Sequence, residues 1–445
     1  MHSTRLGRRI AALAVPAFLA LVAEPLFLLV DSAIVGHLGT SPLAGLGVAS
    51  AVLLTAANVF VFLAYGTTSI VARRAGSGDR SAALSAGLDG GWLALVLGVP
   101  VAVLVGLAAV PLCALFGASA QAGEQASVYL RISAIGLPAM LIALAATGAL
   151  RGLQDTRTPL IVSVVGFSAN AGLNAWFVLG CGWGIAGSAW GTVLAQTGMA
   201  AALVIVLLRQ ARRERAVIRP RLAGVVAAAG GGVPLLIRTL ALRAILLLTT
   251  WVAAGLGDVP LAAHQVAATI WTFQAFALDA LAIAAQAVTG TELGAGNAAG
   301  VRRATSLMLA WGAGAGAVVG LLLVAAHLLV APLFTADPAV QGALSAAVVV
   351  IGCSGWLSGL VFVADGVLIG AGDGRWLAGA MVATLAAYLP VIWAVRLNTA
   401  ALAALGAPSA MTVLWLAFMV FMAIRWGFLW FRIRSDDWMV LGATR

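Results

Sequence analysis

The sequence predicts an all-α polytopic membrane protein with twelve transmembrane helices in two related halves. Of its 445 residues, 62% are hydrophobic and only 9% are charged, which is far less charge than a soluble protein needs to cover its surface. Arginines lie in short segments between long apolar runs, and motifs of the first half recur in the second. These three observations together predict two pseudo-symmetric six-helix bundles.

Apolar runs long enough to cross a bilayer, which takes about 20 helical residues, follow one another along the chain. The first follows a basic start, residues 1–9, and resembles a signal peptide. It continues past any suitable cleavage site and carries Glu24 and Asp31, so we interpret it as the first membrane helix. The predicted helices lie near residues 10–36, 44–72, 86–111, 122–148, 159–180, 184–208, 231–254, 261–288, 306–330, 340–370, 376–395 and 405–430.

All 25 basic residues are arginines, and they fall before the first predicted helix, in every second connection and after the last helix. The alternate connections carry almost none, and Arg396 is the exception. This is the positive-inside pattern. It predicts a multi-pass protein of the cytoplasmic (inner) membrane with both termini in the cytoplasm.

Matching motifs of the two halves are separated by one constant number of residues, the number that separates Pro16 from Pro234. The same number separates Pro42-Leu43-Ala44 from Pro260-Leu261-Ala262, and Gly152 and Asp155 from Gly370 and Asp373. Six helices return the chain to the same side, so the halves should be related by an axis along the membrane normal, an arrangement typical of transporters. We therefore expect an N-terminal lobe (1–208), a basic cytoplasmic linker (209–230) and a C-terminal lobe with a cytoplasmic tail (231–445).

Several classes of function are disfavoured. The formal charge of +10 is explained by the loop arginines, so we predict no nucleic-acid partner. No GxxxxGK[ST] loop is present and the chain has no Lys, so ATP is not an expected partner. No Ser/His/Asp or Cys/His arrangement predicts an enzyme, and no His, Cys and Asp residues have metal-ligand spacing. We expect no cofactor and no metal.

Ionisable residues within the first helix are the main candidates for function. Glu24 and Asp31 are separated by two helical turns and so share a face. Because a carboxylate in lipid is costly, it should face a cavity or a partner. Removal from water favours its protonated form, so such a group can exchange a proton, or bind a small cation through oxygen. The alternative is a purely structural carboxylate. Pro16 and Pro25 can bend this helix, either as a static kink or as part of a switch.

Polar residues in later helices could complete a site. Asn170 and Asn174 lie one turn apart in the fifth helix and Thr192 lies in the sixth, and they offer neutral oxygens to a proton or cation at Asp31. Ordinary hydrogen bonding between helices is the alternative. In the second half, Asp279, Asp365, Arg238 and Arg243 lie within predicted helices. They are secondary candidates, with a structural ion pair as the alternative.

The segment VAEPLFLLVDSAIVGHLGTSPLAGLG (22–47) resembles the first-helix signature of the multidrug and toxic compound extrusion (MATE) family. The resemblance continues through VARRAGSGD, LRGLQDTRTPL, GCGWGIAGSAWGT, LAAHQVA, FALDALAIAAQAVTG and LIGAGD, in family order over nearly the whole chain. LAAHQVA and ALDALAIAAQ are similar to the DinF-like branch.

This resemblance implies a MATE/MOP-type fold, with twelve helices in two bundles around a central cavity. It implies a monomer that exports small organic compounds in exchange for H⁺ or Na⁺, with Asp31 as the coupling carboxylate and Asn170 and Thr192 as its companions. Asn174 stands where some members carry Asp, which favours H⁺. Pro16 matches the proline associated with bending, and Asp365 resembles a tenth-helix carboxylate.

Two alternative functions stay open at the level of sequence. A lipid-linked precursor flippase of the same superfamily would need membrane-embedded arginines clustered in the cleft, and a non-transporting receptor or scaffold would need no ion-responsive carboxylate.

Overall fold

The computed structural model describes residues 2–117 and 119–443, and the side chains of these residues except 2–5 and 24. No strand occurs in these ranges. The helices are α1 (His2–Gly36), α2 (Thr40–Phe60), α3 (Phe62–Gly76), α4 (Arg80–Leu107), α5 (Ala109–Ala114), α6 (Ala120–Ala134), α7 (Leu137–Gly152), α8 (Arg157–Ala175), the π-helix η1 (Trp176–Gly180), α9 (Gly184–Arg213), α10 (Leu222–Gly255), α11 (Asp258–Gly294), α12 (Ala298–Phe334), α13 (Pro338–Cys353), α14 (Gly355–Gly370), α15 (Gly374–Leu397), α16 (Thr399–Ala404) and α17 (Ala407–Ser435).

The described ranges contain ten to twelve candidate membrane spans, judged by length and apolar composition. Ten segments are each long and apolar enough to span a bilayer. Two bent helix pairs qualify only when each pair is taken together: α6 meets α7 at 53° and α13 meets α14 at 55°. Counting each pair as one span gives the predicted number of twelve. The sequence predicted each pair as one unbroken helix. The bends lie at repeat-related places, since Leu137 and Gly355, which begin α7 and α14, are equivalent positions of the internal repeat.

The chain forms two compact units. The N-terminal lobe comprises residues 12–233 and two short pieces that begin at Gly294 and Gly442. The C-terminal lobe comprises residues 234–293 and 297–441, and the first residues of the chain, up to Ala11, also belong to it. The division therefore falls inside α10, at Pro234. The basic segment 209–230 includes the end of α9, a short connection and the start of α10.

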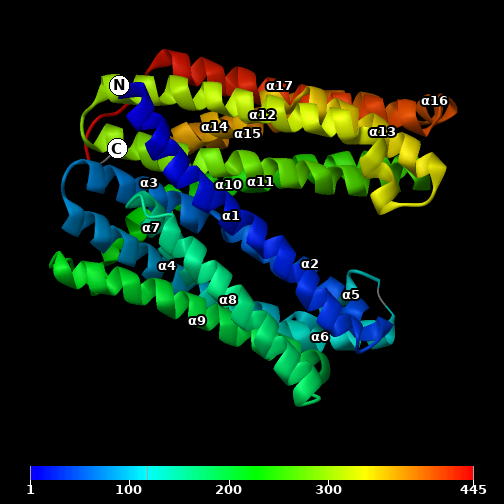
Figure 1. The fold of residues 1–445 in the computed structure, drawn as a ribbon, viewed down its shortest axis with the longest axis horizontal. Coiled ribbons are helices and arrows are strands. Elements are labelled where there is room, and N and C mark those ends of the chain that lie inside the picture. The colour runs from blue at the N-terminus through cyan, green and yellow to red at the C-terminus, as the bar shows by residue number, and fades with distance from the viewer. Residues whose placement is uncertain (1, 118, 444–445) are drawn as a thin grey trace. The chain divides into compact units, whose positions relative to one another are not determined.

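Within each lobe, the helices pack through small residues. In the N-terminal lobe α7 packs against α3 and α4, and α8 against α9; in the C-terminal lobe α12 packs against α13 and α14 (Figure 1). Added Cβ atoms at Gly148 and Gly152 would lie 2.3 and 2.8 Å from the carbonyl oxygens of Ala64 and Thr68. The repeat-equivalent positions, Gly366 and Gly370, lie similarly close to Ala282 and Gln286. The repeat therefore preserves specific backbone contacts.

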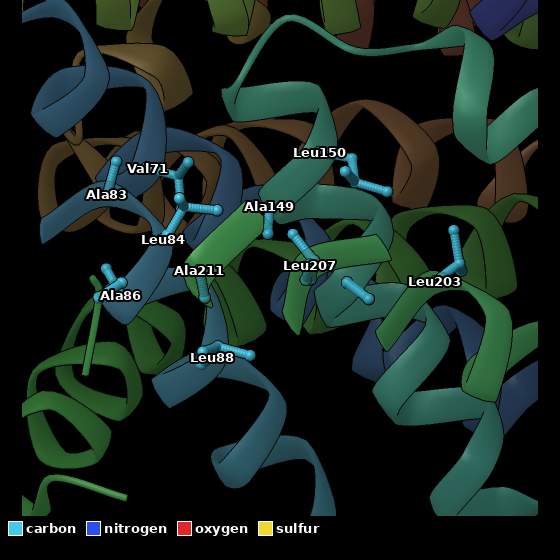
Figure 2. Close-up of a cluster of buried hydrophobic side chains, with 12 residues drawn as sticks. Val71, Ala83, Leu84, Ala86, Leu88, Ala149, Leu150, Leu203, Leu207 and Ala211 are labelled. Carbon is cyan, nitrogen blue, oxygen red and sulfur yellow. The ribbon is translucent and has the colours of Figure 1, made fainter. Parts of the chain in front are cut away.

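The core of the N-terminal lobe is made of small and branched aliphatic side chains. One cluster joins α3, α4, α7 and α9 and includes Val71, Leu84, Leu150, Leu203 and Leu207 (Figure 2). A second cluster, around Val35, Leu46 and Tyr129, packs α1 and α2 against α6 and α9. This second cluster adjoins the polar residues described next.

Candidate functional site

Asp31 lies near the end of α1 and is 6% exposed. The amide of Asn170 donates from Nδ2 to Asp31 Oδ2 at 3.2 Å, and that of Asn174 donates from Nδ2 to Asp31 Oδ1 at 2.6 Å. Both asparagines come from α8, one helical turn apart, so their side chains reach the same carboxylate. Each carboxylate oxygen is thus held by one neutral N–H donor.

The polar cluster continues into two more helices. The Thr192 hydroxyl on α9 donates to Asn170 Oδ1 at 3.4 Å, and the Tyr129 hydroxyl on α6 lies 3.4 Å from Thr192 Oγ1. The Thr192 hydroxyl is also 3.1 Å from the carbonyl oxygen of Ser188. The Ser188 hydroxyl and Asn174 Oδ1 are buried and form no hydrogen bond with described residues. We call Asp31, Tyr129, Asn170, Asn174, Ser188 and Thr192 the acid–amide cluster.

The backbone around Asn174 explains why it lies so close to α9. A Cβ atom at Gly191 would lie 2.0 Å from Asn174 Oδ1, so any larger residue there would displace the amide. Just beyond Asn174, α8 changes to the π-helix η1, in which the Cys181 N–H donates to the Trp176 carbonyl at 2.9 Å. Such turns often occur at functional sites because they change the direction of side chains.

No arginine forms an ion pair with Asp31 among the residues that the structure describes. Neutral amides can accommodate either form of the acid. Their N–H groups donate to a carboxylate, and after rotation their oxygens accept from a carboxylic acid. The unused Asn174 Oδ1 is one such acceptor. The cluster can therefore hold or release one proton without leaving a buried cation unpaired.

The structure brings together the four residues predicted as the coupling site: Asp31, Asn170, Asn174 and Thr192. Sequence reasoning missed Tyr129 and Ser188. Ser188 precedes Thr192 by one turn, which was a usable signal, but nothing local marks Tyr129.

The other candidates predicted on α1 are Glu24, Pro16 and Pro25. The Glu24 side chain lies outside the described residues. Pro16 and Pro25 lie within α1, which stays helical through both. Pro16 leaves the Ala12 carbonyl without its helical donor, and the Thr156 hydroxyl lies 3.5 Å from that oxygen.

Asp365, on α14 in the C-terminal lobe, has different partners. Arg238 on α10 and Arg425 on α17 both donate to its Oδ2 atom, and all three side chains are buried. The structural ion pair given as the alternative for Arg238 and Asp365 is therefore present, while Arg425, in the apolar run of the last span, was missed. Asp279 lies half-buried on α11, and the exposed Arg243 forms no ion pair with a described residue.

The repeat gives the Asp31 site a counterpart. The positions equivalent to Asp31 and Asn170 are Thr249 and Tyr388, and their hydroxyl oxygens are 3.0 Å apart in the buried interior of the C-terminal lobe. The same two positions thus hold an acid and an amide in one lobe and two hydroxyl groups in the other. No group of three His, Cys, Asp or Glu residues in the described ranges could hold a metal ion.

The comparisons with known proteins agree with the repeat. The model of the MatE family matches residues 16–176 and again residues 234–393. The two matches begin at Pro16 and Pro234, the pair that sets the offset found within the sequence.

Protein DETOXIFICATION 44, chloroplastic, from Arabidopsis thaliana is 33% identical over 85% of this chain and 74% of its own. DNA damage-inducible protein F from Escherichia coli is 32% identical over 64% of this chain and 63% of its own. A solved structure described as the outward-facing conformation of a multidrug resistance MATE family transporter of the MOP superfamily has a TM-score of 0.83 at 22% identity, over 97% of this chain and 96% of that one. The chain is a multi-pass membrane protein that belongs to the MatE family of MATE transporters.

Proposed function

We propose that this protein is a secondary antiporter that exports amphipathic organic compounds in exchange for H⁺, with Asp31 as the coupling carboxylate and Na⁺ as the alternative ion. Family membership supports export, because relatives include multidrug resistance proteins. The arginine distribution supports a place in the inner membrane with both termini in the cytoplasm. The protein would act as a monomer, without ATP or nucleic acid.

The observation that carries this proposal is a buried acid held only by neutral donors. A permanent arginine partner would keep the carboxylate ionised, as at Asp365. At Asp31, two amides hold the carboxylate, so protonation removes one charge and strands no cation. The cluster favours H⁺ over Na⁺, because it holds a single carboxylate, with Asn174 where some family members carry Asp, and a tight cation site draws on more charged oxygen ligands.

The exchange follows from competition at this acid. A proton arriving from outside neutralises Asp31 and weakens its two bonds to α8, since hydrogen bonds to a charged group are the stronger ones. Freed from α8, α1 can rearrange and displace substrate from the N-terminal lobe, with bending at Pro16 or Pro25, where proline removes a helical hydrogen bond. The membrane potential adds ~2.3 kcal/mol per charge for each 100 mV.

The test is transport in proteoliposomes. Drug efflux is followed by fluorescence dequenching, with pH and Na⁺ gradients imposed separately, and proton release is followed on addition of substrate. The wild type should respond to the pH gradient, and Asp31→Asn should insert and fold but lose efflux and proton release. Asp258→Asn, a neutralised exposed carboxylate at the start of α11, is the matched control and should behave like the wild type. Wild-type efflux by Asp31→Asn would remove Asp31 from the coupling role.

The flippase alternative has less support. Two of the membrane-embedded arginines that it would use, Arg238 and Arg425, are bound to Asp365. A non-transporting receptor would leave the acid–amide cluster without a purpose, and the proteoliposome assay distinguishes it directly, because a receptor would release no protons on addition of substrate.

A further inference from the structure

The surface of the C-terminal lobe carries an apolar groove of about 420 Å³ between α10 and α15. The side chains that line it are Ala244, Leu247, Leu248, Trp251, Leu385 and Leu389. Leu247 is 69% exposed and Leu389 is 44% exposed, so the groove is open along its side. No charged residue lines it among those described.

Arg396 lies beyond one end of this groove, in the last turn of α15. Its guanidinium carbon lies 4.9 Å from the centre of the Trp251 ring, and Trp251 stacks on Trp393 with ring centres 6.1 Å apart. The guanidinium also lies against the backbone of α10 one turn beyond Trp251, where a Cβ atom at Gly255 would be only 2.4 Å from Nη1. Aromatic and backbone contacts thus hold this cation in a defined position.

No acidic group pairs with Arg396 among the described residues. Arg396 is also the exception among the connections that otherwise carry almost no arginine. It lies at the end of α15 that is remote from the basic segments. A fixed, half-buried cation without a counter-ion is a suitable partner for an anion from outside the chain.

The order of chemical groups along the groove matches one leaflet of a bilayer. Leu385 and Arg396 are three helical turns apart on α15, so at the helical rise they are separated by about 16 Å, roughly half of the ~30 Å hydrocarbon core. Apolar side chains occupy the deeper part, the Trp251–Trp393 pair comes next, and the cation comes last. Acyl chain, interface and phosphate follow one another in the same order, and tryptophans are enriched at that interface.

We propose that this groove binds one anionic phospholipid, with its phosphate on Arg396 and one acyl chain along α10 and α15. The phospholipid fits better than an organic substrate because the lining is wholly apolar and about one leaflet deep, and a fixed cation, Arg396, stands at its interfacial end. The exposed Arg243 precedes Ala244 on α10 at the deeper end and does not line the groove. This inference is independent of Asp31 and of the coupling ion.

The headgroup is tested with purified full-length protein in detergent. Phosphatidylglycerol and phosphatidylcholine with identical chains are added, and retention of lipid is measured by native mass spectrometry, with Tm as a second readout. The wild type should retain phosphatidylglycerol preferentially. Arg396→Gln should reduce that preference about fivefold, as expected from ~1 kcal/mol per arginine near a lipid surface, and Arg396→Lys should keep most of it. Arg375→Gln, at the opposite end of α15 and exposed, should keep all of it.

The groove is tested by filling it. Ala244→Phe should lower retention of both lipids, whereas Ala387→Phe, which places the same ring on an exposed part of α15 outside the groove lining, should not. Leu389→Gln gives a second disruption of the groove should the first variant fold poorly. Equal retention of the two lipids by the wild type, or an undiminished preference in Arg396→Gln, overturns the proposal. So does a groove variant that loses drug efflux while retaining lipid, because the occupant would then be the substrate.

Discussion

The two lobes each bury a carboxylate inside the membrane, and they treat it in opposite ways. Asp31 in the N-terminal lobe accepts from two neutral amides, whereas Asp365 in the C-terminal lobe accepts from two guanidinium groups. Protonation of Asp31 removes a charge that no cation balances, while protonation of Asp365 would strand two buried cations. The partners of an intramembrane acid, more than its burial, therefore decide whether it can exchange protons.

The repeat sharpens this contrast. The close glycine contacts at Gly148 and Gly366 are the same in both lobes, yet the repeat-related polar pair is Asp31 with Asn170 in one lobe and Thr249 with Tyr388 in the other. The backbone arrangement is thus shared and the titratable chemistry is not. We infer that coupling resides in the N-terminal lobe and that the C-terminal charges maintain structure.

The largest expected effect tests whether Asp365 and its two arginines stabilise the fold. Asp365→Asn leaves Arg238 and Arg425 without the carboxylate, and removal of one partner from a buried ion pair costs about 3–5 kcal/mol. We expect a large fall in Tm and in yield of folded protein, measured by thermal unfolding in detergent. Asp31→Asn is the counterpart, and its Tm should stay near that of the wild type. Similar Tm values for all three proteins would contradict the division of roles.

The next effect concerns the approach of α8 to α9. Gly191→Ala places a methyl group 2.0 Å from the present position of Asn174 Oδ1, which should displace the amide from Asp31 at a cost of about 1–3 kcal/mol for overpacking. Efflux should fall markedly. Gly198→Ala is the matched control, because its Cβ would meet open space on the same helix. Wild-type efflux by the Gly191 variant would show that the Asn174 contact is dispensable.

The smallest effects come from a matched pair of tyrosines. Tyr129→Phe and Tyr388→Phe each remove one buried neutral hydrogen bond, worth about 1 kcal/mol, from Thr192 and Thr249 respectively. Both should lower Tm slightly. Only Tyr129→Phe should change the dependence of efflux on the pH gradient, because only Thr192 connects to Asp31. An equal change in both variants would argue that the C-terminal pair also takes part in coupling.

Much of the architecture could be predicted from the sequence, because bilayer-length apolar runs, loop arginines and the internal repeat are local or periodic signals. Asp31 could be singled out for the same reason. What could not be predicted depends on contacts between distant helices: Tyr129 reaching Thr192, Arg425 reaching Asp365, and Gly191 leaving room for Asn174. The bends after α6 and α13 were also missed, although Gly136 and Pro138 mark the first and Ser354 and Gly355 the second, because hydropathy continues unbroken through both.

The connection between the halves is fastened to α4. Ser85 Oγ accepts from the Val217 N–H at 3.0 Å, Asp89 accepts from the Arg221 guanidinium at 2.6 Å, and Trp92 donates to the Ile218 carbonyl at 3.4 Å. These side chains recur every three or four residues along one stripe of α4. The segment is consequently a poor place for an inserted tag or a protease site, despite its exposed arginines. A version split into two separately expressed halves should reassemble only if residues 217–221 remain attached to the first half.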